Sequence, residues 1–399
     1  MHIFLPISLY WNKEKKVKKV QIMIYLDNSA TTHTKPKQVI KAVNLGLTKF
    51  SANPGRGGHK ASINTAIEVE TVREKVKNFV NGYKSQYVIF TSGCTEALNL
   101  AILGCAQNGG HVICTCNDHN SVIRPLNYLV DAGLISVSVA TPCDNIKITR
   151  QDIEKHLKPN TYMICVNHMS NVDGMIADIQ AIGELCMEKC ILFLVDGAQS
   201  AGHLKIDMQK QHIDLLALAP HKGLYAPQGV GVLITSGKAK INPIKFGGTG
   251  TESFNTRQPI SYPEGFESGT IATPNILGLG AGLDFVSENF QAINHKIEDL
   301  STYLNFELRK INKIKVYTHP DNCYGVIAFN IEGMESETVC QILNDKYNIC
   351  ARNGLQCAPL KHKHLGTIES GVVRLSLSYF NSFNEIVSVL KAVKQIAQA

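Results

Sequence analysis

The chain has 399 residues, 44% of them hydrophobic, and a formal net charge of +7 at pH 7. Because that length exceeds the size at which one hydrophobic core stops growing, we expect two domains. Lysines between residues 13 and 19 supply much of the charge, and the rest of the chain is near balance, which argues against a nucleic-acid partner.

The cysteines and the first residues indicate a cellular compartment. Twelve cysteines are scattered without framework spacing, which is typical of reduced thiols inside a cell. In residues 1–22 a short apolar stretch precedes the lysines, the reverse of the charge order in a signal peptide, and no apolar run reaches membrane-spanning length. We expect a cytoplasmic protein without membrane association, in which residues 1–22 are a tail or a misassigned start before Met23.

The predicted elements begin with a helix and continue as an alternating pattern. Apolar residues recur at helical spacing between Ala66 and Phe79 and stop at Asn81 and Gly82, which predicts a helix with a glycine terminator. Short β-branched runs then alternate with helical stretches, at residues 87–90, 111–114, 162–166, 191–195, 215–219 and 230–234. This alternation predicts an α/β fold with a mostly parallel sheet covered by helices.

The pattern changes after Gly280. A long helical stretch over residues 283–308 leads to a strand at 326–330, a helix near 336–343 and a strand at 372–378. This order predicts a smaller α+β domain joined by a helix. We therefore divide the chain into an N-terminal segment and large domain, residues 23–285, and a small C-terminal domain, residues 286–399.

Two apolar runs end at residues with matching chemistry. Lys222 follows the run at residues 215–220, and Asp196 ends the run at residues 191–195. A lysine that forms an imine and a carboxylate that pairs with a pyridinium nitrogen are the minimal protein equipment for pyridoxal phosphate (PLP). The pair predicts a PLP site.

Three further positions follow predicted strands. The turn at residues 91–96 joins a strand to a helix N-terminus, where backbone N–H groups suit a phosphate and Thr95 adds a hydroxyl, although many such turns only cap helices. His119 lies at the carboxyl edge of the sheet, where it could stack on a ring or be an ordinary loop histidine. Asn171 could bind cofactor or substrate, or could form a turn.

Nine short motifs, taken in their order along the chain, together resemble those of a known family. The chain resembles the class V aminotransferase family, and within it the cysteine desulfurases and selenocysteine lyases, from about Ile24 to the C-terminus. The motifs are residues 27–32 (DNSATT), 57–59 (GGH), 92–96 (SGCTE), His119, 170–171 (SN), 195–199 (VDGAQ), 221–222 (HK), 266–270 (FESGT) and 352–358 (RNGLQCA).

The resemblance implies fold type I of the PLP-dependent transferases and a set of cofactor contacts. Lys222 would hold PLP and move the substrate Cα proton, and Asp196 would pair with the pyridinium nitrogen. Gln199 would reach the ring hydroxyl and His119 would stack on the ring. Asn171 would flank cofactor and substrate.

The resemblance also implies phosphate and substrate contacts. Cys94, Thr95 and His221 would hold the phosphate together with Thr270 of a second subunit, so that a homodimer is expected. Arg374 would bind the substrate carboxylate through a bidentate contact. The other residues implied on the substrate side are Asn28, His59 and Arg352.

Cys357 distinguishes between functions. In the desulfurases that the chain resembles, a cysteine here takes the sulfur of L-cysteine as a persulfide and leaves L-alanine, for delivery to a sulfur-acceptor protein. We expect a mobile but positioned loop, with positive potential from Arg352 and residues 361–364 favouring the thiolate. The alternatives are a selenocysteine lyase, a class V aminotransferase acting on another amino acid, and a catalytically silent sulfur-delivery scaffold.

The chain departs from the family pattern at three places. Ala219 stands where many relatives have a serine, which would remove one phosphate contact. Leu355 and Gln356 replace two histidines before the reactive cysteine, and Gly223 is an extra residue after Lys222. Pairs such as Cys114 with Cys116 and Cys186 with Cys190 lack the spacing of zinc or iron–sulfur sites, so we expect no structural metal.

Overall fold

The computed structural model describes residues 23–55, 57–144 and 146–399. Within these residues seven strands form a central sheet in the order β2-β10-β9-β8-β6-β3-β4. Strand β10 runs antiparallel to β2 and β9, and the other neighbouring pairs are parallel. The strands are β2 (Val88–Thr91), β3 (Gly110–Thr115), β4 (Ile135–Ala140), β6 (Thr161–Asn167), β8 (Leu192–Asp196), β9 (Leu215–Leu218) and β10 (Gly231–Thr235). The predicted α/β fold with a mostly parallel sheet is confirmed.

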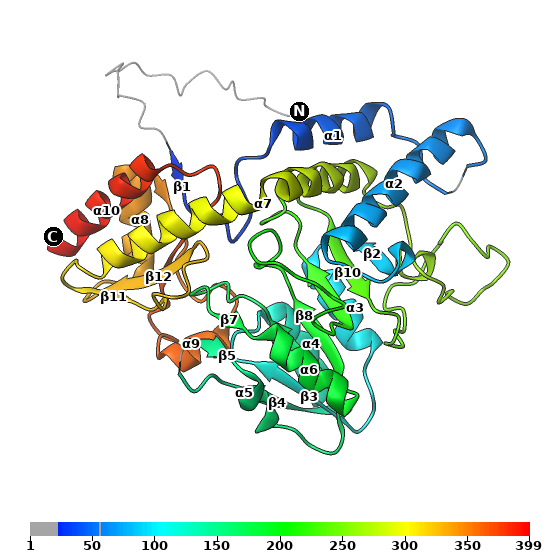
Figure 1. Ribbon diagram of the computed structural model, residues 1–399, viewed down its shortest axis with the longest axis horizontal. Coiled ribbons are helices and arrows are strands. Elements are labelled where there is room, and N and C mark those ends of the chain that lie inside the picture. Colours follow the sequence, from blue (N-terminus) through cyan, green and yellow to red (C-terminus); the bar gives the residue numbers. More distant parts are fainter. Residues whose placement is uncertain (1–22, 56, 145) are drawn as a thin grey trace, which may run out of the picture.

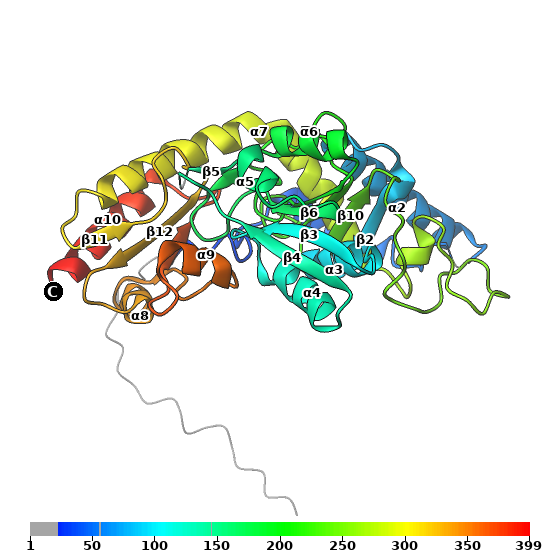
Figure 2. The same ribbon diagram turned by 90° about the horizontal axis from the view of Figure 1, so that it is seen from below.

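Helices cover both faces of this sheet. Helices α3 (Cys94–Gly104) and α4 (Asn120–Asp131) lie on one face, and α6 (Ile179–Lys189) lies on the other (Figure 2). All seven residues of β6 are buried, as expected for a parallel strand between two helical layers. Because β2, β3, β6, β8 and β9 run in the same direction, the segments that follow them meet at one edge of the sheet.

A single helix, α7 (Thr273–Leu308), extends across both parts of the molecule. Its 36 residues span about 54 Å at the usual rise per residue. It runs from α1 (Lys37–Thr48) and α2 (Lys60–Phe79) to α10 (Phe383–Gln398) (Figure 1). The left-handed residue after α2 is Asn81, with a φ of 49°, rather than the expected Gly82. The predicted division at residue 285 falls inside α7 and stays a prediction.

A smaller antiparallel sheet forms the other part. Its order is β11 (Ile314–Val316), β12 (Val326–Ile331), β14 (Val373–Ser376), and α8 (Ser336–Tyr347) and α10 pack on it. The first described strand, β1 (Ile24–Tyr25), pairs in parallel with β13 (Ile349–Cys350), and its Ile24 is packed in this core. The remaining elements are β5 (Lys147–Ile148), α5 (Arg150–Glu154), β7 (Ile176–Ala177), α9 (Pro359–Leu365) and the short 3₁₀ helices Ser85–Tyr87 and Glu264–Phe266.

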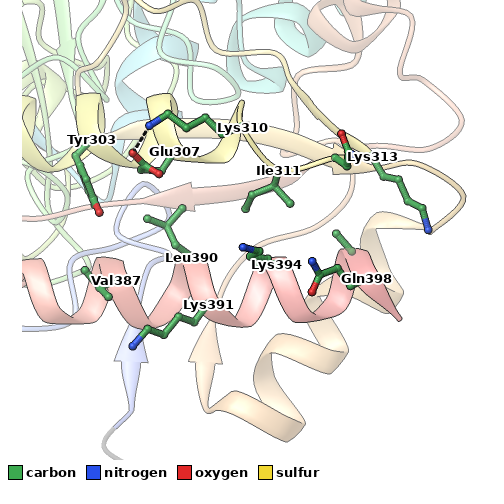
Figure 3. A pocket seen from close by; sticks show the side chains of 12 residues that line it. Tyr303, Glu307, Lys310, Ile311, Lys313, Val387, Leu390, Lys391, Lys394 and Gln398 are labelled. Atoms are coloured by element: carbon green, nitrogen blue, oxygen red, sulfur yellow. Dashed lines mark hydrogen bonds and ion pairs between the residues drawn. The ribbon is translucent and has the colours of Figure 1, made fainter.

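A surface groove lies beside α10, away from the predicted site residues. This groove of about 790 Å³ separates the end of α7 from α10, with an apolar floor that includes Leu390 and a rim that includes Lys313, Lys391 and Lys394 (Figure 3). It contains none of the predicted site residues.

Over the described ranges, no helix combines the length and apolar character needed to cross a lipid bilayer.

Candidate active site

A cavity of about 180 Å³ lies where the same-direction strands of the large sheet end. The loops after β2, β3, β6, β8 and β9 all contribute to its wall. Among the lining residues are eight that the sequence predicted, namely Cys94, Thr95, His119, Asn171, Asp196, Gln199, His221 and Lys222. The larger groove beside α10 holds none of this chemistry, so we assign the site to the smaller cavity.

Lys222 supplies an amine of lowered basicity. Removal from water lowers the pKa of its Nζ, and this effect outweighs the opposing influence of Cys94 and Asp196. The backbone before it is held firmly, since the His221 carbonyl accepts hydrogen bonds from the Thr32 hydroxyl and from Nζ of Lys35, at 3.0 and 3.1 Å. The backbone at Lys222 is therefore anchored, and its amine is easier to deprotonate than that of a surface lysine.

Asp196 brings a negative charge to the cavity. It ends β8, is 2% exposed and lines the cavity. Its Oδ1 accepts a hydrogen bond from the Ala198 N–H at 2.9 Å, and its Oδ2 accepts one from Nδ2 of Asn167 at 3.4 Å. These donors orient the carboxylate and stabilise its charge.

His119 is held as a neutral ring. It is the N-cap residue of α4, and its Nδ1 accepts the backbone N–H of Ser121 at 3.1 Å. Burial lowers the pKa of the imidazole, and together with the smaller lowering by Lys222, Arg124 and Arg352 it outweighs the opposite influence of Asp196. Since Nδ1 is an acceptor, the single ring proton is on Nε2. An uncharged flat ring suits stacking against an aromatic cofactor.

The N-terminus of α3 forms another wall of the cavity. Cys94 is the first residue of this helix, and burial raises the pKa of its thiol well above the usual value, so the thiol is protonated. The Thr95 hydroxyl lies 2.9 Å from the Ser121 hydroxyl. Burial lowers the pKa of His221 to about 4, so this ring is also neutral. Positive potential for an anion here comes from the helix N-terminus.

Arg374 and Arg352 lie on neighbouring backbone segments. Their backbones exchange two hydrogen bonds, at 2.7 and 3.1 Å. The Arg374 guanidinium is 2% exposed, donates to the Asn171 carbonyl at 2.9 Å and lies 2.5 Å from Oδ1 of Asp27. Its Nε has no hydrogen-bond partner among the described residues. The charge of Arg352 contributes to the lowered pKa of Lys222.

Besides Arg352, Arg374 and Cys357, three further predicted residues do not line this cavity. Nδ2 of Asn28 donates to the Ser376 carbonyl at 2.9 Å, which holds the N-terminal segment against β14. His59 is exposed and caps α2. Thr270 is exposed and lines a separate cavity that includes Ser92. Their predicted roles stay predictions.

Cys357 is exposed beside a second cavity of about 470 Å³, which shares Thr95, His119 and Ser121 with the first. Its carbonyl accepts the Asn120 N–H at 2.8 Å. The expectation that residues 361–364 surround it with positive charge is wrong for two of them. Lys361 is buried in an ion pair with Asp173, and His362 is buried with a lowered pKa.

Sequence reasoning missed some residues of this site. Asn167 ends β6 and lines the cavity, so a polar residue at the end of an apolar strand was the available signal. Asp27, the partner of Arg374, lies within a motif that the sequence did flag. Gln356 was treated as a lost histidine, whereas its amide is buried and hydrogen-bonded.

The chain belongs to the class V aminotransferases, since residues 24–389 match the model of that family. Among proteins of known sequence, it is 30% identical to a probable cysteine desulfurase of Methanothermobacter thermautotrophicus and 30% identical to another of Halalkalibacterium halodurans. These alignments cover 94% of this chain and 94% and 93% of the relatives. The structure is similar to the apo cysteine desulfurase of Thermococcus onnurineus, with a TM-score of 0.88, 29% identity and coverage of 94% and 95%.

This family uses PLP, and the residues present fit that cofactor. The cavity offers an amine of lowered pKa, a buried carboxylate and a helix N-terminus, which match a carbonyl, a pyridinium nitrogen and a phosphate. Three buried side-chain atoms of its lining, Oδ1 of Asn167, Oδ1 of Asn171 and Nδ1 of His221, have no hydrogen-bond partner among the described residues. Buried polar atoms of this kind are normally satisfied, so they are consistent with a polar ligand.

Proposed function

We propose that this protein is a PLP-dependent cysteine desulfurase that converts L-cysteine to L-alanine and keeps the sulfur as a persulfide on Cys357. The observation that carries the proposal is the adjacency of two cavities. One holds Lys222 and Asp196, the other exposes Cys357, and His119 lines both. The names of the relatives support the same reaction.

Lys222, Asp196, Gln199 and His119 would hold the cofactor ring, and the α3 N-terminus with Thr95 and His221 would hold its phosphate. When bound, PLP supplies an electron sink that makes the substrate Cα proton removable. The lowered pKa of Lys222 makes its neutral Nζ available to accept that proton. Asp196 keeps a fixed negative charge beside the ring site, and the neutral His119 covers it.

The Cys357 thiolate then attacks Sγ of the substrate. A sulfur–sulfur bond forms as the substrate carbon–sulfur bond breaks, and Cβ keeps the electron pair of the broken bond. Cβ takes a proton and Lys222 returns a proton to Cα, so the organic product is alanine and the enzyme carries one additional sulfur atom. Arg374 would bind the substrate carboxylate through its guanidinium, with Arg352 adding positive potential.

The same proposal includes a homodimer, an acceptor protein for the sulfur and a cytoplasmic location. Thr270 is exposed and does not line the Lys222 cavity of its own subunit, which supports a contact with the site of a second subunit. Large apolar side chains are exposed nearby in the segment of residues 246–260, including Phe246, Phe254 and Ile260. All twelve cysteines are free thiols, which supports a reducing compartment.

The decisive experiment incubates the PLP-loaded protein with L-cysteine and a reductant and measures sulfide and alanine together. Equal amounts are expected from the wild type and neither from Cys357→Ser. Activity of Cys357→Ser on selenocysteine alone would indicate a selenocysteine lyase, and accumulation of pyridoxamine phosphate would indicate a transaminase. A visible absorption band that is lost in Lys222→Ala reports cofactor attachment, and its absence from the wild type would contradict every enzymatic alternative.

A further inference from the structure

The segment around Cys357 has an unusual backbone. Gln356 and Cys357 both have positive φ angles, 42° and 59°, directly after Leu355 and a glycine with a φ of 84°. Two successive non-glycine residues in the left-handed region are unfavourable unless the surroundings hold them there. The contacts that hold this turn are therefore informative about its function.

Two backbone carbonyls of the turn are tied to the large domain. The Gln356 carbonyl accepts a hydrogen bond from Nδ2 of Asn171 at 2.7 Å. The Cys357 carbonyl accepts the N–H of Asn120 at 2.8 Å, which satisfies a donor at the N-terminus of α4. Asn171 and Asn120 both lie beside the cavity of Lys222, since Asn171 lines it and Asn120 follows His119. The turn is thus anchored to the wall of the predicted cofactor site.

The Gln356 side chain connects the turn to its own domain. It is 5% exposed, and its Nε2 donates to the Val372 carbonyl at 3.1 Å. Its Oε1 lies 3.0 Å from Nε2 of His362, which must be the donor because an amide oxygen only accepts. Nδ1 of His362 then accepts from the Thr367 hydroxyl at 2.8 Å. Gln356 thus belongs to a series of buried hydrogen bonds that runs from Val372 through Gln356 and His362 to Thr367.

A buried ion pair joins the same two parts of the chain. Nζ of Lys361, four residues after Cys357 on α9, lies 2.7 Å from Oδ2 of Asp173. The side chains are 0% and 4% exposed. Asp173 is two residues beyond Asn171, so the ion pair and the Asn171 contact reinforce each other.

We propose that Gln356 and the buried Asp173–Lys361 ion pair are positioning residues that fix the Cys357 turn beside His119 before substrate arrives. Cys357 remains exposed while its immediate neighbour Gln356 is buried, so the thiol is accessible on a held backbone. This role rests on the proposed function, because a positioned thiol matters for catalysis only if Cys357 accepts sulfur. It replaces the expectation of a mobile loop with that of a preorganised one.

The test compares the PLP-loaded wild type with Gln356→Ala and with Glu369→Ala, an exposed change in the turn after α9. In Gln356→Ala we expect faster hydrogen exchange at the amides of Asn120 and Ala358 and a roughly tenfold or greater loss of kcat for L-cysteine. KM and the cofactor absorption of the folded variant should change little. The melting temperature should fall, because Val372 and His362 each lose a buried hydrogen-bond partner, and Glu369→Ala should match the wild type. A folded Gln356→Ala with wild-type exchange and kcat would overturn the proposal.

The ion pair needs a second variant because Lys361→Met alone leaves Asp173 buried without a partner and is expected to unfold readily. The double variant Asp173→Leu with Lys361→Met removes both charges. Its melting temperature should return toward that of the wild type, while hydrogen exchange at Ala358 should be faster, and kcat lower, than in the wild type. Wild-type exchange and kcat in the double variant would overturn the positioning role of the pair. Exchange requires no turnover, so slow exchange in a wild type that makes no sulfide would contradict the proposed function and leave the anchored turn intact.

Discussion

Asp27 and Arg374 form a close ion pair between the N-terminal segment and β14, with 2.5 Å between Oδ1 and Nη2. Arg374 is 2% exposed, and burial lowers the pKa of its guanidinium while Asp27 opposes that lowering. The arginine that is predicted to bind a substrate carboxylate thus already faces a protein carboxylate. Its Nε has no partner among the described residues, which leaves a donor for the substrate.

Arg374→Lys should separate planar recognition from charge. A lysine keeps the positive charge but loses the fork of donors that matches a carboxylate. We expect KM for L-cysteine to rise about tenfold to a hundredfold, with a smaller change in kcat, because a charged hydrogen bond contributes about 1.5–3 kcal/mol. Steady-state kinetics measures both constants, with exposed Arg257→Lys as the control. An unchanged KM would assign the substrate carboxylate to another residue.

Asp27→Asn tests whether the protein carboxylate competes with the substrate. Removal of a negative charge beside Arg374 should lower KM for L-cysteine several-fold, and the lost charged hydrogen bond should reduce the free energy of unfolding by about 1–3 kcal/mol. Kinetics and urea denaturation give the two quantities. A higher KM would mean that Asp27 orients the guanidinium for the substrate and does not compete with it.

Thiol labelling of the native protein should be selective. Of the twelve cysteines only Cys143, Cys190 and Cys357 are exposed, and burial raises the pKa of thiols such as Cys94 and Cys114. Brief treatment with iodoacetamide followed by mass spectrometry should therefore add up to three groups, and one fewer in Cys357→Ser. Rapid labelling of Cys94 would show that the cavity opens more than the structure indicates.

His168 predicts a loss of stability in acid. Burial lowers the pKa of this imidazole from about 6.5 to about 4, so the unfolded chain binds a proton that the folded chain does not. The stability from this group is full above about pH 6.5 and falls as the pH approaches 4. Between pH 7 and pH 5 the loss should be about 2 kcal/mol. The pKa values of His111, His203 and His221 are also lowered to about 4, so these groups add to the loss in both the wild type and His168→Gln. Urea unfolding should therefore show that the wild type loses about 2 kcal/mol more than His168→Gln over this pH range, and equal losses would assign the effect to other groups.

The sequence predicted what depends on local patterns. The sequence indicates Asp196 and Lys222 because one ends a buried apolar strand and the other follows one, and all eight predicted strands, six of them in the large sheet, are present. Strand β4 was missed because it lies at the edge of the sheet and its residues are only partly buried.

Contacts between distant segments could not be predicted. Asp27 meets Arg374 across 347 residues of sequence. Lys361 sits among basic residues and reads as a surface cation, yet it is buried because Asp173, far away in the chain, provides its counter-charge. The local pattern contains neither partner, and only the tertiary fold brings them together.

The pairing of β1 with β13 also sets an order of events during synthesis. Ile24 pairs with Ile349, so the first strand has no partner until roughly 300 further residues have been made. At the usual translation rate this is a delay of about 15 to 65 seconds. Asp27 follows β1 and Arg374 lies beyond β13, so the ion pair of the predicted carboxylate-binding arginine cannot form on a ribosome-bound fragment that lacks β14. The large sheet can fold first, whereas the contact between Asp27 and Arg374 forms only after β14 has been made.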